Sequence, residues 1–345
     1  MSTVHANLRS SRFVNLCLAN FLVHLYLFAH LWLVHRWVKQ EGGWYDFAWI
    51  IVAFALGVFV PGPFVAHILE RYKRKYLYLV ALVVFAVAMP WGAIHETPEA
   101  YAVAGMGYGV MQIALGATIV NDIVVSANRT MADSLFGWAG RMGIPLGLAG
   151  GMLLSSHYMY LEYFWWATLP VVLAFLLVAQ TSIPVKAPVH MNIISLDRFL
   201  LPSSWCPMLM QVGMAFSLGA MVLYVKDVNP CVAFFVGSGI AWIWQLNDPP
   251  HYFCTKRILW SYMTCMAAWG IVLFWHFVGE WPDNVGLETL LYGAGGYGYA
   301  MTSGEVLHRG VETAEHCQRG TVQNTHTLAT VIGFAVGYAF FWWMP

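Results

Sequence analysis

The sequence predicts an all-α integral membrane protein, because both its composition and the spacing of its apolar segments are typical of that class. Of the 345 residues, 59% are hydrophobic and only 10% are charged, and the mean hydropathy is +0.62. Soluble domains carry about 25% charged residues. Apolar segments of about 20 residues, long enough to cross a bilayer core, recur along the whole chain. The formal net charge of zero gives no reason to expect nucleic-acid binding.

The apolar segments predict eleven transmembrane helices in two groups. The longest internal loop, residues 183–198, contains proline and polar residues and separates six predicted spans from five. We therefore predict a six-helix bundle in residues 1–182, a cytoplasmic linker in 183–198 and a five-helix bundle in 199–345. The predicted spans, in chain order, are 13–37, 45–69, 76–95, 99–125, 131–155, 160–182, 199–225, 230–247, 257–278, 284–308 and 320–344.

The distribution of cations predicts the orientation of the chain. When the N-terminus is placed in the cytoplasm, most of the 17 Lys and Arg residues fall on the cytoplasmic side, as the positive-inside rule requires. An odd number of spans then places the C-terminus on the periplasmic side.

A short basic segment between the second and third spans carries a family resemblance. It resembles the loop between helices 2 and 3 of the major facilitator superfamily of secondary transporters, which reads Pro-x-x-Gly-x-x-x-Asp-Arg-x-Gly-Arg-Lys. The matching residues are Pro63, Arg71, Arg74 and Lys75, with Glu70 in place of the Asp and with Ala66 and Lys73 in place of the two glycines. The resemblance implies two helical bundles that rock about a central site. It also implies a gating role for Glu70, Arg71, Arg74 and Lys75, whose alternative is a purely topogenic charge cluster.

The two halves also repeat a pattern of glycines. Gly107-Tyr108-Gly109 precedes Arg129, Gly143 and Gly147 in the first half, and Gly296-Tyr297-Gly298 precedes Arg319, Gly333 and Gly337 in the second. Repeats of this kind are typical of the superfamily. Gly143, Gly147 and Gly151 form a stripe of small residues, which predicts close approach of the fifth helix to a neighbour.

The predicted helix number departs from the resemblance. The superfamily usually has twelve helices, and this chain shows eleven. Transport is expected to survive the loss of a helix that flanks the bundle, but a helix from a partner subunit could equally take its place. The departure therefore leaves open a second function: a non-transporting scaffold or receptor subunit of a membrane complex.

One charged residue lies near the middle of a predicted span. Arg141 lies about 15 Å along the fifth helix from its start near Met131. A charge at that depth is costly and marks a functional-site hypothesis. We predict that it holds an anionic or carbonyl-bearing solute; the alternative is a structural cation bonded to carbonyls or to a polar residue such as Gln112 or Gln211.

Two histidines are candidates for proton coupling. His24 lies near the centre of the first span, one helical turn from Asn20 and on the same face. His326 lies early in the eleventh span. Histidine titrates near physiological pH, so either residue could carry a proton, although a neutral histidine bonded inside the bundle is the common alternative.

These residues together predict a secondary active transporter of the bacterial inner membrane. Its solute would be a small organic molecule, anionic or amphipathic, that binds in a cavity with aromatic walls. The solute would cross the membrane by alternating access. The candidate binding residues are Arg141, Asn20, His24, Gln112, Gln211 and Tyr292. The six Cys show no metal-ligand spacing, and the sequence predicts no cofactor, no metal and no enzymatic activity. A further alternative is a haem- or quinone-linked electron-transfer subunit, but only the His and Met content supports that hypothesis.

Overall fold

The computed structural model is predominantly α-helical in the part of the chain that it describes. It describes residues 8–41, 44–64, 67–68, 71–112, 119–120, 123–124, 129–156, 162–183, 205–247, 255–278, 285–313 and 319–343. Each of the eleven predicted spans overlaps a helix, and α8 and α9 together form the sixth. The fourth span, predicted over 99–125, overlaps α5 only as far as residue 109, and residues 113–118, 121–122 and 125 lie outside the described residues. The predicted linker lies outside the described residues except for Ile183. The exact boundaries of the two bundles therefore stay a prediction.

The helices of the first bundle lie where spans were predicted, although α2 and α5 end before the predicted limits. They are α1 (Ser11–Glu41), α2 (Trp44–Phe59), α4 (Arg74–His95), α5 (Pro98–Gly109), α7 (Arg129–Leu154), α8 (Glu162–Trp166) and α9 (Leu169–Gln180). The second span was predicted to run to residue 69, but α2 ends at Phe59 because Pro61 and Pro63 cannot continue a helix. A short 3₁₀ turn, η1 (Gly62–Phe64), follows.

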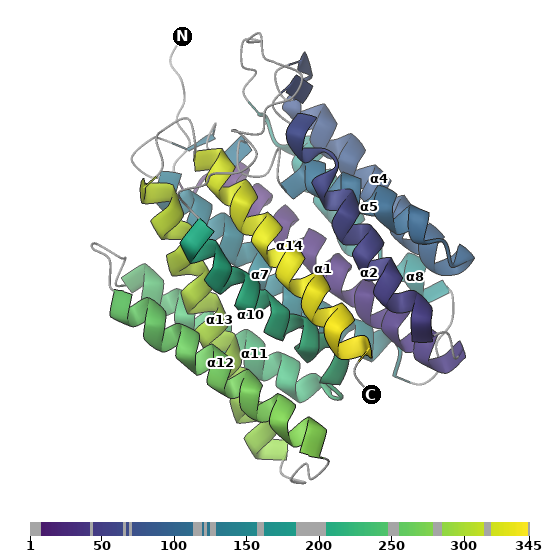
Figure 1. Cartoon of the computed structure of the whole chain (residues 1–345). Helices are drawn as coiled ribbons and strands as arrows, with labels where there is room; N and C mark the ends of the chain where they lie inside the picture. The colour runs from purple at the N-terminus through teal and green to yellow at the C-terminus, as the bar shows by residue number, and fades with distance from the viewer. Residues whose placement is uncertain are drawn as a thin grey trace.

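The second bundle contains five long helices. They are α10 (Trp205–Tyr224), α11 (Val228–Asn247), α12 (Thr255–Val278), α13 (Val285–Thr313) and α14 (Arg319–Trp343). The start of α1 and the end of α14 lie at opposite ends of the molecule (Figure 1), as an odd number of crossings requires. We call the end at which α1 begins the inner end and the opposite end the outer end, following the predicted orientation.

Several helices are apolar and long enough to cross a membrane unaided. They are Ser11–Gln40, Arg74–His95, Glu162–Gln180, Lys256–Val278 and Asn324–Trp343, and shorter apolar helices cover Ala48–Phe64 and Met208–Tyr224. The helices outside this set include α7 and α13, which are rich in glycine and carry charged side chains. Such helices need partners on most sides, and these two contact each other and several further helices of both bundles.

The two bundles repeat the same helix contacts. In the first, α1 packs on α7, α2 on α5 and α4 on α5; in the second, α10 packs on α14, α11 on α13 and α12 on α13. Helices α2 and α14 form one contact between the bundles, and α7 and α11 form the equivalent contact on the other side. The first bundle adds α9, which packs on α1 and α4, and the described part of the second bundle holds no counterpart of α9.

The repeated glycines explain how the helices come so close. A Cβ on Gly143 or Gly147 of α7 would collide with the carbonyl oxygens of Phe21 or Leu25 of α1, each 2.5 Å away. Gly333 and Gly337 of α14 meet the carbonyl oxygens of Val212 and Phe216 of α10 in the same way. The predicted stripe of small residues therefore forms a backbone-to-backbone helix crossing, and it does so once in each bundle.

The Gly-Tyr-Gly part of the predicted repeat is out of register by two residues. Gly105, not Gly107, meets the carbonyl oxygen of Phe54 in α2, and Gly296 meets that of Phe234 in α11. Gly105 and Gly296 are thus the equivalent positions. Advancing three residues from each makes Tyr108 equivalent to Tyr299.

The basic segment lies at the inner end of the first bundle. Lys75 donates a hydrogen bond to the carbonyl oxygen of Ala179 at the end of α9 (2.6 Å), where the helix dipole favours a cation. Arg71 is exposed, Arg74 is half-buried, and Glu70 lies outside the described residues. The segment thus ties α4 to α9, and its gating role stays a prediction.

The orientation can be tested at this segment. If the basic segment faces the cytoplasm, a cysteine in the variant Arg71→Cys will react with a membrane-impermeant maleimide in inside-out vesicles and will be protected in intact cells. The matched position at the outer end is Lys226→Cys, which is exposed between α10 and α11 and will show the opposite pattern. Labelling of Arg71→Cys in intact cells would contradict the orientation.

Candidate functional site

A cavity of about 110 Å³ lies between the two bundles near the middle of the helices. One water needs roughly 10–15 Å³ on this measure, so the cavity holds several waters or a small solute. Seven helices line it: α1, α2, α5 and α7 from the first bundle, and α10, α13 and α14 from the second. Its lining is divided: polar side chains gather toward the inner end, and apolar ones toward the outer end.

The polar part begins with a hydrogen-bonded group from the first bundle. Asn20 donates to the carbonyl oxygen of Phe136 (2.8 Å) and accepts from the side-chain amide of Gln112 (2.8 Å). The two ring nitrogens of His24 lie 2.9 Å from the carbonyl oxygen of Asn20 and 3.0 Å from the hydroxyl of Tyr108. Asn20 and Gln112 are buried.

This arrangement fixes the form of a neutral His24. The Asn20 carbonyl can only accept, so His24 Nδ1 must carry the hydrogen. In the neutral ring Nε2 is then an acceptor, and the Tyr108 hydroxyl donates to it. A proton on Nε2 would reverse that last hydrogen bond and free the Tyr108 hydrogen for another acceptor.

Arg141 lies at the contact between the bundles. It is 7% exposed, and its Nη1 donates to the hydroxyl of Ser303 on α13 across a distance of 3.4 Å. That hydroxyl also lies 3.2 Å from His326 Nε2 on α14. Among the described residues, the buried Arg141 Nε has no hydrogen-bond partner, and no carboxylate lies at ion-pair distance from this guanidinium. The site therefore presents a buried cation with unused donors.

The second bundle supplies a matching polar residue. Gln211 on α10 donates to the hydroxyl of Thr330 on α14 (2.7 Å), and its side-chain oxygen has no partner among the described residues. Since Phe21 in α1 is equivalent to Val212 in α10, Asn20 is equivalent to Gln211. The pairs Asn20/Gln211 and Tyr108/Tyr299 thus give the cavity a pseudo-symmetric polar ring, whereas Arg141 has no cationic counterpart, because the register of Gly143 and Gly333 places Val331 at the equivalent position.

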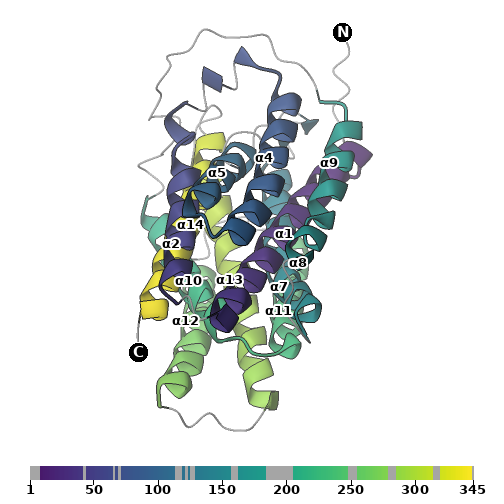
Figure 2. The same ribbon diagram turned by 90° about the vertical axis from the view of Figure 1, so that its right-hand side faces the viewer.

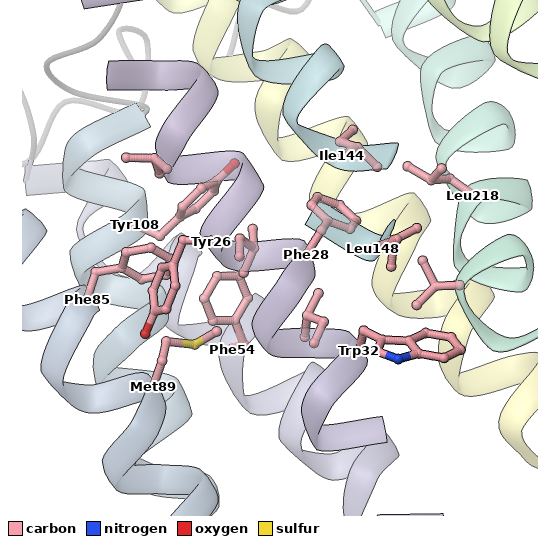
Figure 3. Packing of buried hydrophobic residues seen from close by; sticks show 14 of the residues in the cluster. Tyr26, Phe28, Trp32, Phe54, Phe85, Met89, Tyr108, Ile144, Leu148 and Leu218 are labelled. Atoms are coloured by element: carbon pink, nitrogen blue, oxygen red, sulfur yellow. The ribbon is translucent and has the colours of Figure 1, made fainter. Parts of the chain in front are cut away.

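The outer part of the cavity is apolar. The side chain of Phe28 points from α1 toward Ile144, Leu148 and Leu218 (Figure 3). The side chain of Tyr26 points from α1 toward Phe85 inside the first bundle. Phe28 also meets Phe334 of α14 edge-to-face, with ring centroids 5.7 Å apart. Ile51, Phe54, Leu218 and Phe334 complete this wall. A cavity with a cation at one pole and hydrocarbon at the other suits an amphipathic anion.

Solved structures of known transporters share this arrangement of helices. A D-xylose–proton symporter superimposes with a TM-score of 0.71 at 14% identity, over 96% of this chain and 89% of that chain. The Escherichia coli fucose:proton symporter gives 0.66 at 14% identity, over 94% and 89%. The human organic anion transporter MFSD10 gives 0.60 at 15% identity, over 96% and 91%. No protein-family model and no curated protein matches the chain.

The chain has the major facilitator superfamily fold. At these identities the likeness extends to the fold, and the superfamily resemblance predicted from the basic segment and the repeat is confirmed at that level. The fold is that of multi-pass membrane transporters.

Within this superfamily fold, most of the predicted site residues meet at one place. The cavity is lined by Asn20, His24, Gln112, Arg141, Gln211 and His326. Tyr292 lies elsewhere: it is fully buried inside the second bundle, and its ring meets Trp269 of α12 edge-to-face at 5.2 Å. Tyr292 is two helical turns, roughly 10 Å, nearer the outer end than Tyr299, where α13 packs on α12.

Sequence reasoning missed two polar residues of the site. Ser303 and Thr330 carry the hydrogen bonds of Arg141 and Gln211, yet neither was a candidate. Thr330 lies one helical turn from the predicted residue His326, and Ser303 lies one turn from Tyr299, which also lines the cavity; that i, i+4 spacing is the signal the sequence offered. Over the described ranges, no three His, Cys, Asp or Glu side chains are grouped so that they could hold a metal ion.

Proposed function

We propose that the protein is a secondary active transporter that moves a small organic anion across the bacterial inner membrane by alternating access. The observation that carries this proposal is Arg141, a buried guanidinium between the two bundles whose Nε has no hydrogen-bond partner among the described residues. A buried charge without a counter-ion is costly, and a bound carboxylate or similar anion would offset that cost by charge-assisted, bidentate hydrogen bonds.

The contacts between the bundles fit alternating access. Toward the inner end, Trp138 of α7 stacks on Trp242 of α11 with ring centroids 4.0 Å apart. Toward the outer end, His35 Nδ1 lies 2.8 Å from the hydroxyl of Tyr338 on α14. These two sets lie on opposite sides of the cavity. We propose that one set breaks while the other holds, with the basic segment at Arg71, Arg74 and Lys75 assisting at the inner end.

The predicted substrate can be tested by ligand-dependent stability. A ligand that binds only the folded state raises its apparent melting temperature in proportion to occupancy. Organic carboxylates, zwitterions and cationic drugs will be compared on the purified protein in nanodiscs. We expect carboxylates to raise Tm and cations to leave it unchanged. Shifts with cations alone would discard the anion assignment, and no shift at all, together with a second chain at fixed stoichiometry, would favour the scaffold function.

Proton coupling is proposed through His24 and His326. Each histidine touches a hydroxyl that can reverse its hydrogen bond, Tyr108 or Ser303, and Ser303 also contacts Arg141. A proton on His326 would repel the guanidinium unless an anion were bound. Proton and anion are therefore expected to bind together, with a coupling of roughly fivefold or more.

Replacing either histidine tests this coupling. In His24→Gln or His326→Gln, an inward proton gradient is expected to lose most of its stimulation of anion uptake into proteoliposomes, while gradient-free exchange continues. The control His95→Gln changes a histidine whose ring centroid lies 4.3 Å from that of Trp91 at the outer end of α4, away from the cavity, and will keep the stimulation. Full stimulation in both cavity variants would exclude these histidines as the coupling groups.

A further inference from the structure

The central cavity and a membrane-facing groove share two lining residues. The groove, of about 440 Å³, lies between α2 and α14, which run side by side at the left of Figure 2. Ala55 of α2 and Ala335 of α14 line both the groove and the cavity. Small side chains thus form the only described boundary that the two spaces have in common.

The groove is lined by apolar side chains. Its floor consists of Ala55, Ala335 and Ala339, all buried, and its walls carry large exposed side chains. Those walls include Leu56 (63% exposed) and Val336 (54% exposed). Toward the outer end, Trp343 lines the groove and meets Trp49 edge-to-face, with ring centroids 6.4 Å apart. The groove therefore opens sideways, toward the bilayer.

The equivalent contact between the bundles, formed by α7 and α11, is filled by larger side chains. Between α7 and α11, Trp138 and Trp242 stack face to face, and Met142 Cε lies 3.7 Å from the Cβ position of Gly239. A second membrane-facing groove, between α11 and α13, shares none of its described lining residues with the central cavity. A boundary made of small side chains, at Ala55 and Ala335, is thus found at the α2–α14 contact and not at the equivalent α7–α11 contact.

We propose that the substrate is a single-chain amphipathic anion whose hydrocarbon tail passes between Ala55 and Ala335 into the α2–α14 groove, so that it reaches the cavity from the bilayer. This rests on the proposed function, because its head group binds Arg141. On α14, the tail would run from the level of His326 to Ala335, nine residues or roughly 14 Å. The cavity's apolar pole, formed by Phe28, Phe334 and their neighbours, lies on that path. A tail that leaves through the groove also explains how a cavity of only about 110 Å³ can hold a larger molecule.

The test compares chain length in variants of the full-length protein in nanodiscs. Binding of radiolabelled butyrate and laurate will be measured for the wild type and for Ala335→Phe, Ala55→Phe, Val236→Phe and Arg141→Ala. The wild type is expected to bind laurate at least tenfold more tightly than butyrate. Either alanine variant is expected to remove that advantage, and a cooperative thermal unfolding transition near the wild-type temperature will show that the variant is folded. Val236→Phe fills the α11–α13 groove and will change neither affinity.

The outcomes separate the two proposals. Loss of both ligands in Arg141→Ala, with laurate no tighter than butyrate in the wild type, would keep the anion site and overturn the lateral route. Tight laurate binding that survives both Ala335→Phe and Ala55→Phe would likewise overturn it. Laurate binding that survives Arg141→Ala would overturn the head-group assignment, and with it the proposed function.

Discussion

Replacing Arg141 by alanine is expected to weaken binding of organic anions by about ten- to a hundredfold. Charge-assisted hydrogen bonds contribute about 1.5–3 kcal/mol each, and the guanidinium offers donors that no carboxylate among the described residues uses. Arg141→Lys keeps the charge but loses the planar fork and is expected to lie between the wild type and Arg141→Ala. Isothermal titration with the tightest carboxylate of the panel checks both.

The same residue distinguishes a functional cation from a structural one. Arg141 has no counter-ion among the described residues, and a buried charge of that kind does not stabilise a fold. Arg141→Met is therefore expected to keep or raise the melting temperature of the ligand-free protein while binding is lost. The control Lys226→Ala removes an exposed cation between α10 and α11 and will leave binding unchanged. A large fall in Tm for Arg141→Met would instead show that Arg141 holds the bundles together.

Gly147→Ala is expected to destabilise the protein by about 2 kcal/mol. Its added Cβ would lie 2.5 Å from the carbonyl oxygen of Leu25 and 3.0 Å from Phe28 Cβ, so α1 and α7 must move apart. Overpacking of a close contact costs about 1–3 kcal/mol. Separation of these helices would also shift Arg141, which lies on α7, so anion binding will weaken together with stability.

The neighbouring Gly150→Ala provides the matched control. It lies on the same helix, and a Cβ there would meet no atom within 4 Å. We expect no loss of stability, and up to about 1 kcal/mol of gain, because alanine favours helix more than glycine does. Thermal unfolding of both variants in nanodiscs measures the difference. Equal effects at the two positions would mean that the close crossing of α1 and α7 does not limit stability.

The fold could be predicted from sequence because its determinants are local. Span lengths follow from runs of apolar residues, and Gly143 and Gly147 reveal a close helix crossing before its partner is known. The register of the Gly-Tyr-Gly repeat could not be fixed in this way. Gly105, Gly107 and Gly109 are spaced two apart, so two alignments with Gly296 and Gly298 are possible, and only the contacts with α2 and α11 choose between them.

The site was partly predictable for a related reason. A charge within a span, such as Arg141, stands out in any sequence, and so does a histidine near a span centre. Tyr292 shows what a local pattern cannot predict. It shares a helix face with Tyr299 but packs against α12. The position of the cavity along α13 depends on how α13 packs on α12, which no local pattern encodes. Ser303 was missed because one serine in a membrane helix resembles any other until Arg141 is placed beside it.

Uptake into proteoliposomes tests the central claim most directly. Vesicles containing the wild type, Arg141→Ala or Lys226→Ala will be preloaded with the tightest-binding carboxylate, and entry of the radiolabelled compound will be followed. We predict rapid exchange in the wild type and in Lys226→Ala, and exchange slower by at least about tenfold in Arg141→Ala at a substrate concentration below the wild-type Kd. Exchange at the wild-type rate in Arg141→Ala, or no exchange in any vesicle despite binding, would contradict an anion transporter built around this cavity.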